Sequence, residues 1–160
     1  MRLERENLTF VSGGQTGADR AALDFALQQG FDHGGWCPHG RLAEDGPILP
    51  RYQLRETPGR HYSQRTEWNV RDTDVTILLT ISSQLRGGTA LTARIAEKLS
   101  KPQLHLSRDC GASIQEAGEQ LAAYINEHQA LRINIAGPRL SQEPEIGQYV
   151  SAVLTAAFVS

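Results

Sequence analysis

Little in this sequence marks a secreted, membrane-spanning or nucleic-acid-binding protein. Its 160 residues include only two cysteines, Cys37 and Cys110, which suggest no disulfide framework, so a reducing, cytoplasmic setting is expected. No stretch approaches the roughly 20 apolar residues of a membrane span, and the N-terminal MRLEREN lacks the apolar run of a signal peptide. The formal net charge of −2 argues against a general electrostatic grip on nucleic acid or on an anionic membrane.

The composition and the order of sequence patterns predict one α/β domain. Apolar residues make up 39% of the chain and charged residues 21%, which is ordinary for a globular protein, and no linker or repeat divides residues 1–160. Strand and helix patterns alternate, which predicts a mostly parallel sheet of at least five strands with helices on both faces. Strands are predicted at residues 8–12, 75–81, 103–106 and 131–136, with a short edge strand at 53–56, and helices at 18–29, 63–72, 91–99, 114–127 and 144–158.

Two segments differ from this regular alternation. The run VTILLTI at residues 75–81 is apolar on both faces, as a central strand of a parallel sheet is. Residues 39–62 are rich in proline and glycine and have no sustained pattern. A long irregular segment inside a compact domain is usually functional or mobile.

Three strand-to-helix turns contain unusual residues. They are SGGQTGAD at residues 12–19, QLRGGTALT at 84–92 and AGPRLSQEPE at 136–145. All three are expected at the carboxyl edge of the sheet, where open α/β sheets bind ligands. A helix start offers free N–H groups and partial positive charge. Glycine lets a ligand approach them, so the turns predict a shared anion site.

Other interpretations of these residues are open. A Walker A motif needs Gly-Lys-Ser/Thr, and Ser12 stands where the dinucleotide fingerprint needs its first glycine. Thr16 and Asp19 form a possible capping box, at least as good an interpretation as direct ligand contact. The two glycines at residues 87–88 could simply form a tight turn. His33, Cys37 and His39 have no fourth ligand at a zinc spacing, so no metal site is predicted.

Several blocks resemble the family of molybdenum carrier proteins, whose best-studied relatives are molybdenum cofactor carriers. These blocks are SGGQTGADRAALDFAL, HGGWCPHGRLAEDGPI, RTEWNVRDTDVTILL, GGTALT and INIAGPR, and the resemblance covers roughly residues 11–149. It implies a Rossmann-like three-layer fold related to the lysine decarboxylase-like cytokinin phosphoribohydrolases. It also implies a homo-oligomer and binding of molybdenum cofactor, a pterin with a dithiolene-held molybdenum and a terminal phosphate.

The phosphoribohydrolase relatives share the motif P-G-G-x-G-T-x-x-E, whose glutamate serves catalysis. If Thr89 matches the motif threonine, Thr92 stands at the glutamate position. A hydroxyl cannot act as a general acid as a carboxylate can. The chain therefore resembles the phosphate-binding part of this motif without its catalytic part, which favours a binding protein over an enzyme.

The leading hypothesis is a cytoplasmic carrier that holds molybdenum cofactor or molybdate as a small anionic ligand. Arginine side chains suit the anionic groups, and tryptophan could stack on the pterin. Partners would be a second copy of the chain, in a dimer or tetramer, and molybdoenzyme apoproteins, with no nucleic acid and no membrane. The alternatives are a phosphoribohydrolase-like enzyme that uses another carboxylate and a nucleotide- or metabolite-sensing module. The predicted ligand-binding residues are Ser12, Gly13, Gly14, Gln15, Thr16, Gly17, Arg20, Trp36, Arg65, Trp68, Asn69, Arg71, Arg86, Gly87, Gly88 and Thr89; no catalytic residue and no metal ligand is predicted.

Overall fold

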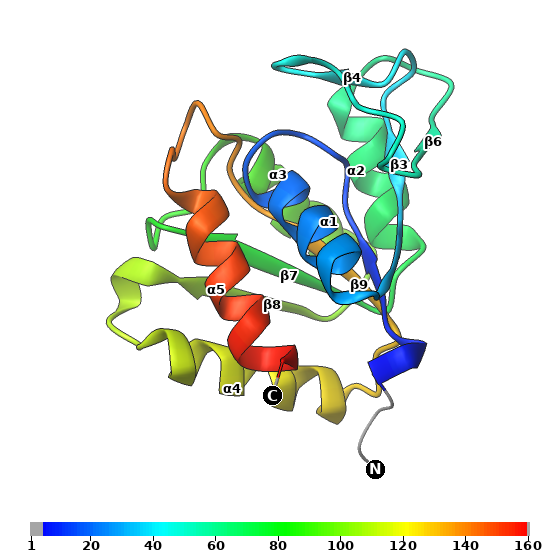
Figure 1. Cartoon of the computed structure of the whole chain (residues 1–160). Helices are drawn as coiled ribbons and strands as arrows, with labels where there is room; N and C mark the ends of the chain where they lie inside the picture. The colour runs from blue at the N-terminus through cyan, green and yellow to red at the C-terminus, as the bar shows by residue number, and fades with distance from the viewer. Residues whose placement is uncertain (1–4, 160) are drawn as a thin grey trace.

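The computed structural model describes residues 5–159 and has a central sheet of five parallel strands (Figure 1). The strand order is β2-β1-β9-β7-β8, and every registered pair in this sheet is parallel. The predicted α/β fold with a parallel sheet is confirmed. The strands are β1 (Thr9–Val11), β2 (Asp32–Gly34), β7 (Val75–Thr80), β8 (Gln103–Ser107) and β9 (Arg132–Ala136).

Helices cover both faces of the sheet, as predicted, and make three layers. In Figure 1, blue α1 and red α5 stand in front of the sheet with α4, while green α2 and α3 lie behind it. The helices are α1 (Ala18–Gln29), α2 (Tyr62–Arg71), α3 (Gly87–Lys98), α4 (Ile114–Glu127) and α5 (Ile146–Phe158). Short 3-10 turns lie at η1 (Arg5–Asn7) and η2 (Arg108–Cys110).

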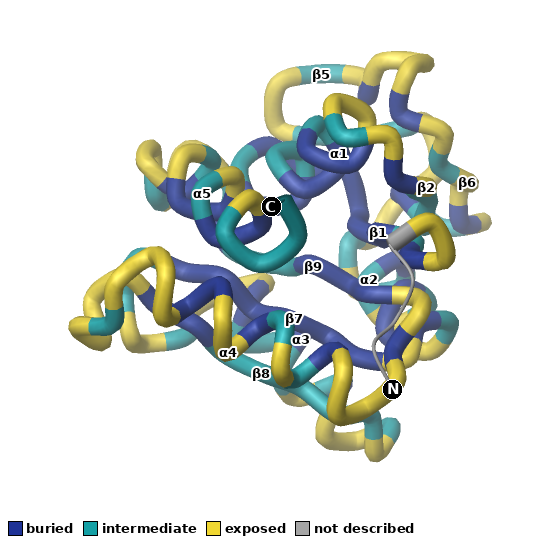
Figure 2. The backbone as a smooth tube through the Cα atoms, turned by 60° about the horizontal axis from the view of Figure 1, so that its bottom comes forward, coloured by how far each residue is buried: buried dark blue, intermediate teal, exposed yellow. Residues whose placement is uncertain are grey.

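The two faces of the central strand β7 differ in polarity. Val75, Ile77 and Leu79 belong to the main apolar core with α1, α4 and α5. Because side chains alternate along a strand, Thr76 and Thr80 point to the face covered by α2 and α3. Both threonines are buried, and Asn134 of β9 donates to the Thr76 hydroxyl at 3.2 Å. Figure 2 shows that buried backbone runs through the sheet between the helical layers. Buried polar groups thus lie beneath α2 and α3.

The irregular segment between β2 and α2 has a small apolar core of its own. Leu23 of α1, Cys37, Ile48 and Tyr52 form it, and the Tyr52 hydroxyl donates to Asp24 at 2.6 Å. The segment contains two short strand pairs, and the strand expected at 53–56 is the two-residue β6. The pairs are β3 (Trp36–Cys37) with β6 (Arg55–Glu56) and β4 (Leu42–Ala43) with β5 (Gly46–Pro47).

Some predicted boundaries were wrong. Helix α3 begins at Gly87 rather than at residue 91, because two glycines in its first turn weaken the sequence signal for helix. Helix α2 begins at Tyr62 after His61, so Ser63 is not its cap. Strand β2 was missed because its sequence, Asp-His-Gly, is polar and lies at an exposed edge of the sheet.

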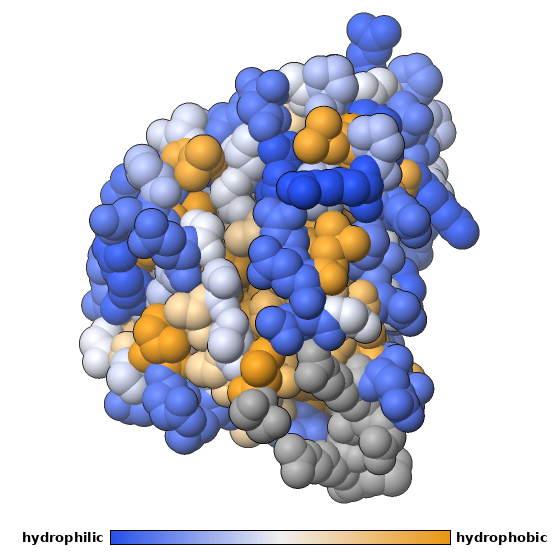
Figure 3. Space-filling view, in the orientation of Figure 1, coloured by the Kyte–Doolittle hydropathy of each residue, from blue (hydrophilic) through white to orange (hydrophobic). Residues whose placement is uncertain are grey.

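Within residues 5–159, no helix combines the length and the apolar character that crossing a membrane requires. On the face shown in Figure 3, apolar side chains form separate spots among polar ones rather than one continuous patch.

The contact between α4 and α5 gives a test of the fold. A Cβ on Gly118 would lie 2.6 Å from Ala156 Cβ and 2.9 Å from its carbonyl carbon, so Gly118→Ala should destabilise the protein by about 1–3 kcal/mol through overpacking. Gly147→Ala is the control, since the nearest atom there is 4.0 Å away, and it should be neutral or stabilise by up to about 1 kcal/mol. Urea midpoints measure both changes, and equal midpoints would contradict this packing.

Candidate functional site

The three glycine-containing turns meet at one pocket on the carboxyl edge of the sheet, as predicted. The cavity measures ≈ 70 Å³. Its wall combines the β1–α1 turn, one face of α2, the first turns of α3, the end of β9 and the β9–α5 loop. The lining residues are Gly13, Gln15, Asp19, Tyr62, Arg65, Thr66, Asn69, Gly88, Thr89, Leu91, Thr92, Asn134, Ile135, Ala136, Gly137, Arg139 and Gln142.

A buried ion pair joins two walls of the pocket. Arg65 Nη1 of α2 lies 3.1 Å from Asp19 Oδ2 of α1, and the side chains are only 11% and 9% exposed. Burial raises the pKa of Asp19 above its ordinary value, and the positive charge of Arg65 opposes that rise. A Cβ on Gly13 would lie 1.5 Å from Arg65 Nη1. The glycine at residue 13 therefore makes room for the protein's own arginine.

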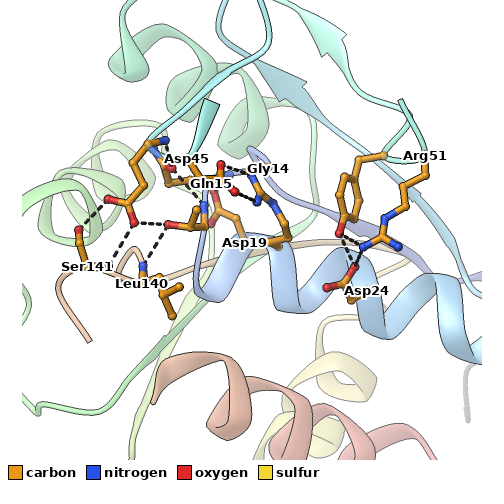
Figure 4. A network of polar contacts seen from close by, with 12 residues as sticks. Gly14, Gln15, Asp19, Asp24, Asp45, Arg51, Leu140 and Ser141 are labelled. Atoms are coloured by element: carbon orange, nitrogen blue, oxygen red, sulfur yellow. Dashed lines mark hydrogen bonds and ion pairs between the residues drawn. The ribbon is translucent and has the colours of Figure 1, made fainter. Parts of the chain in front are cut away.

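The β1–α1 turn is held by the carboxylate of Asp19, at the start of α1. Asp19 Oδ2 accepts the Gln15 N–H at 3.3 Å (Figure 4). The Ser12 hydroxyl donates to the Asp19 carbonyl at 2.9 Å. An anionic side chain thus already occupies donors that the sequence suggested for a ligand. The glycine turn supports the pocket wall more than it offers a vacant phosphate cradle.

The predicted capping box of Thr16 and Asp19 was wrong. The N-cap of α1 is Gly17, at φ 84°, and it makes no side-chain cap bond. Thr16 lies one residue earlier, and its hydroxyl donates to Glu44 and accepts the Leu140 N–H instead. A Cβ on Gly17 would lie 2.4 Å from the Pro138 carbonyl oxygen, so this glycine permits close packing of two turns.

Two more carboxylates bind the backbone at this edge. Glu143 accepts the N–H groups of Ile81 at 2.7 Å and Ser82 at 3.2 Å, directly after β7. Glu44 accepts the Ser141 N–H at 3.1 Å and its hydroxyl at 2.6 Å, and these hydrogen bonds lower the pKa of Glu44. Each of the three turns is thus held by a carboxylate of the chain itself.

The donors that remain for a ligand lie deeper in the pocket. Gln15 Nε2 has no hydrogen-bond partner within the described chain. The hydrogen bonds of Arg65 to Tyr62 and Asp19 use Nε and Nη1, so its Nη2 edge is available to a ligand. At the start of α3, the N–H groups of Thr89 and Ala90 donate to the Arg86 carbonyl at 3.1 and 3.2 Å, which leaves the N–H groups of Gly87 and Gly88 for a ligand. A Cβ on Gly88 would meet no atom within 4 Å, so this end of α3 is open. Together these groups can bind an anion with charge-assisted hydrogen bonds.

The structure places the predicted residues in several environments. Gly13, Gln15, Arg65, Asn69, Gly88 and Thr89 line the pocket. Ser12, Thr16 and Gly17 lie behind it in the contacts described above. Arg20 is bound to Asp45 at 2.6 Å. A Cβ on Gly14, at φ 77°, would lie 2.7 Å from Leu54, on the side of the small core.

The tryptophans lie outside this pocket. Trp36 and Trp68 pack edge to face with centroids 4.8 Å apart, and the Trp36 indole N–H donates to Asp72 at 2.8 Å. Arg71 also binds Asp72, at 2.7 Å. Trp36 lines a separate groove of ≈ 510 Å³ with Arg55 and Arg132 among others. Neither tryptophan can therefore stack on a ligand in this pocket. Stacking on a tryptophan stays a prediction for the separate groove beside Trp36.

A second cavity, of ≈ 220 Å³, adjoins the pocket. Thr89 and Gln142 line both cavities, and the predicted Arg86 lines only the second. Gly87, at φ 51°, is the first residue of α3, and the only atom that an added Cβ would meet within 4 Å belongs to the Gln142 side chain. The two cavities thus meet near the start of α3, at Thr89 and Gln142.

Several lining residues were missing from the predicted set. Tyr62, Thr66 and Asn69 share one face of α2 at positions i, i+4 and i+7, so helical spacing from Asn69 could have found the first two. Asn134 is a polar residue inside an apolar strand, which was a usable signal. Thr92, at the expected glutamate position, lines the pocket and donates to the Gly88 carbonyl at 2.8 Å. Within residues 5–159, no cluster of His, Cys, Asp and Glu could hold a metal ion.

Comparison with known proteins shows the family and the fold of the chain. The model of the circularly permutated YpsA SLOG family matches residues 10–158. A crystal structure described as "Putative molybdenum carrier protein" from Syntrophus aciditrophicus SB is similar over 98% of both chains, with 44% identity and a TM-score of 0.92. The search of curated proteins found no match. The family resemblance and the Rossmann-like fold expected from the sequence are confirmed.

The pKa shift of Asp19 predicts how anion affinity depends on pH. As pH falls through the raised pKa of Asp19, its carboxyl group becomes neutral, and Arg65 retains its full charge for a ligand. Sulfate should therefore bind more tightly as pH falls from neutral, because the charge of sulfate itself stays constant. Calorimetric titration across this range measures the slope.

Asp19→Asn is the matched control for this titration. The variant should bind sulfate at least as tightly as the wild type at neutral pH, with a smaller pH slope. Thermal unfolding should first show that the variant is folded, because it weakens the pairing of Arg65. An unchanged slope in a folded variant would contradict the role given to Asp19.

Proposed function

Because the chain belongs to the circularly permutated YpsA SLOG family and is similar to a protein named as a molybdenum carrier, we propose that it binds and carries a molybdenum species. That species is molybdate or molybdenum cofactor. An oxygen-bearing anionic end enters the pocket beside Arg65 and the start of α3. The protein holds this ligand without transforming it.

The observation that supports this proposal most is the buried cation of the pocket. The Arg65 side chain is 11% exposed, and Asp19 occupies Nη1 but not Nη2. A guanidinium edge at low exposure and a helix start both favour oxyanions. Molybdate and the phosphate and metal-oxo ends of the cofactor all present such oxygens.

The cavity sizes bear on how much of the cofactor could be enclosed. The ≈ 70 Å³ pocket suits a compact oxyanion rather than a fused two-ring pterin. The ≈ 220 Å³ cavity beyond Thr89 and Gln142 offers room for a larger part of an extended ligand. In this proposal Arg65 holds the anionic end, and Arg86 and Gln84 face the remainder. The cofactor itself would supply the molybdenum and its redox chemistry after delivery to another protein.

A second candidate function is nucleotide processing. One observation favours it: Asp19 lines the pocket, and burial raises its pKa, as enzymes often arrange for a general acid. Against this, Asp19 is held by Arg65 and the Gln15 N–H, and Thr92 provides no carboxylate. A nucleotide-sensing module would use the same anion site. A homo-oligomer and transfer to molybdoenzyme apoproteins are further parts of the carrier proposal.

Arg65→Lys tests the binding proposal while retaining positive charge. Lysine lacks the planar fork that reaches both Asp19 and a ligand, so affinity for molybdate should fall about tenfold or more. Equilibrium dialysis with molybdenum measured by mass spectrometry gives the affinity. A second arm incubates the protein with freshly released cofactor and assays retained pterin by fluorescence after oxidation.

Arg71→Ala is the matched control on the same helix. Arg71 is half exposed and pairs with Asp72 outside the pocket, so its loss should leave both readings unchanged. A wild-type protein that retains neither molybdate nor pterin above an unrelated protein would end the carrier proposal. Equal loss in both variants would place the ligand elsewhere.

The non-enzymatic part of the proposal has its own test. Incubation with AMP should release no adenine or ribose 5-phosphate above background, because Thr92 cannot supply the missing carboxylate. Chromatography follows the products. Robust turnover that disappears in Asp19→Asn would favour the nucleotide-processing alternative instead.

A further inference from the structure

Gln15 lines the pocket and has an unsatisfied polar atom in its side chain. The residue Gln15 is 5% exposed, and its side-chain nitrogen Nε2 has no hydrogen-bond partner in the described part of the chain. The other such atom there, Arg20 Nε, belongs to a residue that does not line the pocket. A buried donor without an acceptor is unfavourable unless a ligand or water satisfies it.

Two backbone donors fix the orientation of this amide. Gln15 Oε1 accepts the Thr16 N–H at 3.1 Å and the Glu44 N–H at 2.8 Å. If the amide were flipped, its NH₂ group would face both of these donors. The oxygen must therefore face the backbone, and Nε2 must occupy the opposite position.

Glu44 holds this arrangement from the irregular segment. Its N–H donates to Gln15, and its carboxylate accepts the hydroxyls of Thr16 and Ser141. Glu44 touches Gln15 through its backbone and does not line the pocket. It is a positioning residue for the amide.

We propose that Gln15 determines the ligand specificity of this pocket by donating Nε2–H to an unprotonated oxygen of an oxyanion. The inference rests on the proposed function, because it concerns the same pocket. Arg65 provides charge for any anion, whereas the fixed amide requires an acceptor atom at one position. The ligand class is a tetrahedral oxyanion or a terminal oxo or phosphate group. A neutral group, or one that presents a proton at this position, is disfavoured.

Gln15→Glu is the sharpest variant because it preserves size and shape. One carboxylate oxygen can still accept the Thr16 and Glu44 N–H groups, while the other presents an acceptor and negative charge to the ligand. Affinity for molybdate and for sulfate should fall by about tenfold or more, since a donor is replaced by a repelling acceptor. Gln15→Met removes the donor without adding charge and should cause a smaller loss.

Gln53→Glu controls for the added charge. Gln53 lines the separate groove near Trp36, so this variant should bind both probes as the wild type does. Thermal unfolding checks that each variant is folded. In wild-type protein labelled with nitrogen-15, the Gln15 side-chain amide resonance should also shift on saturation with molybdate, a reading that needs no variant.

The outcomes separate this inference from the proposed function. The inference is supported if the wild type binds the probes, both Gln15 variants lose affinity, and the Gln15 amide resonance shifts. Wild-type binding with unchanged Gln15 variants and no amide shift overturns the inference and leaves the carrier proposal standing. If the wild type binds neither probe, the anion pocket itself is refuted.

Discussion

The ion pair between Asp19 and Arg65 is the interaction on which the candidate site depends. It joins α1 to α2 across the wall of the pocket, and the same Asp19 oxygen accepts the Gln15 N–H of the β1–α1 turn. Glycine is needed at residue 13 because the guanidinium occupies the space that a Cβ would take. Since burial of Asp19 opposes its ionisation, the pair keeps a charged arginine at low exposure only through close mutual contact. Removing either partner would change the shape and the charge of the pocket together.

Carboxylates of the chain bind backbone donors at all three turns along this edge of the sheet. Asp19, Glu143 and Glu44 each bind backbone N–H groups at one of the three turns. These internal anions satisfy donors that would otherwise attract solvent ions, and they fix loops that have little regular structure. In the proposed function, ligand specificity then depends on the few donors left, chiefly the Arg65 guanidinium edge, the Gln15 amide and the start of α3.

Sequence reasoning predicted the layers of the fold, since long apolar runs and helical spacing identify buried elements. It also predicted that the three turns lie at one edge of the sheet, because the carboxyl ends of parallel strands all lie at the same edge. It could not show that the glycine at residue 13 faces Arg65, nor that Trp36 and Trp68 pack against each other away from the pocket. Such facts depend on side-chain direction across elements distant in sequence. Asp19 was weighed as a helix cap because its spacing from Thr16 matched a local motif, whereas its actual partner lies on another helix.

The position of a bound tetrahedral anion tests this account most directly. Tungstate resembles molybdate and scatters X-rays anomalously, so a crystal grown with it would locate the anion without ambiguity. The account predicts one anomalous peak in the pocket, with tungstate oxygens within hydrogen-bonding distance of Arg65, Gln15 Nε2 and the first turn of α3, and with the Asp19–Arg65 contact retained. A peak in the groove beside Trp36, or one that displaces Asp19 from the β1–α1 turn, would contradict it.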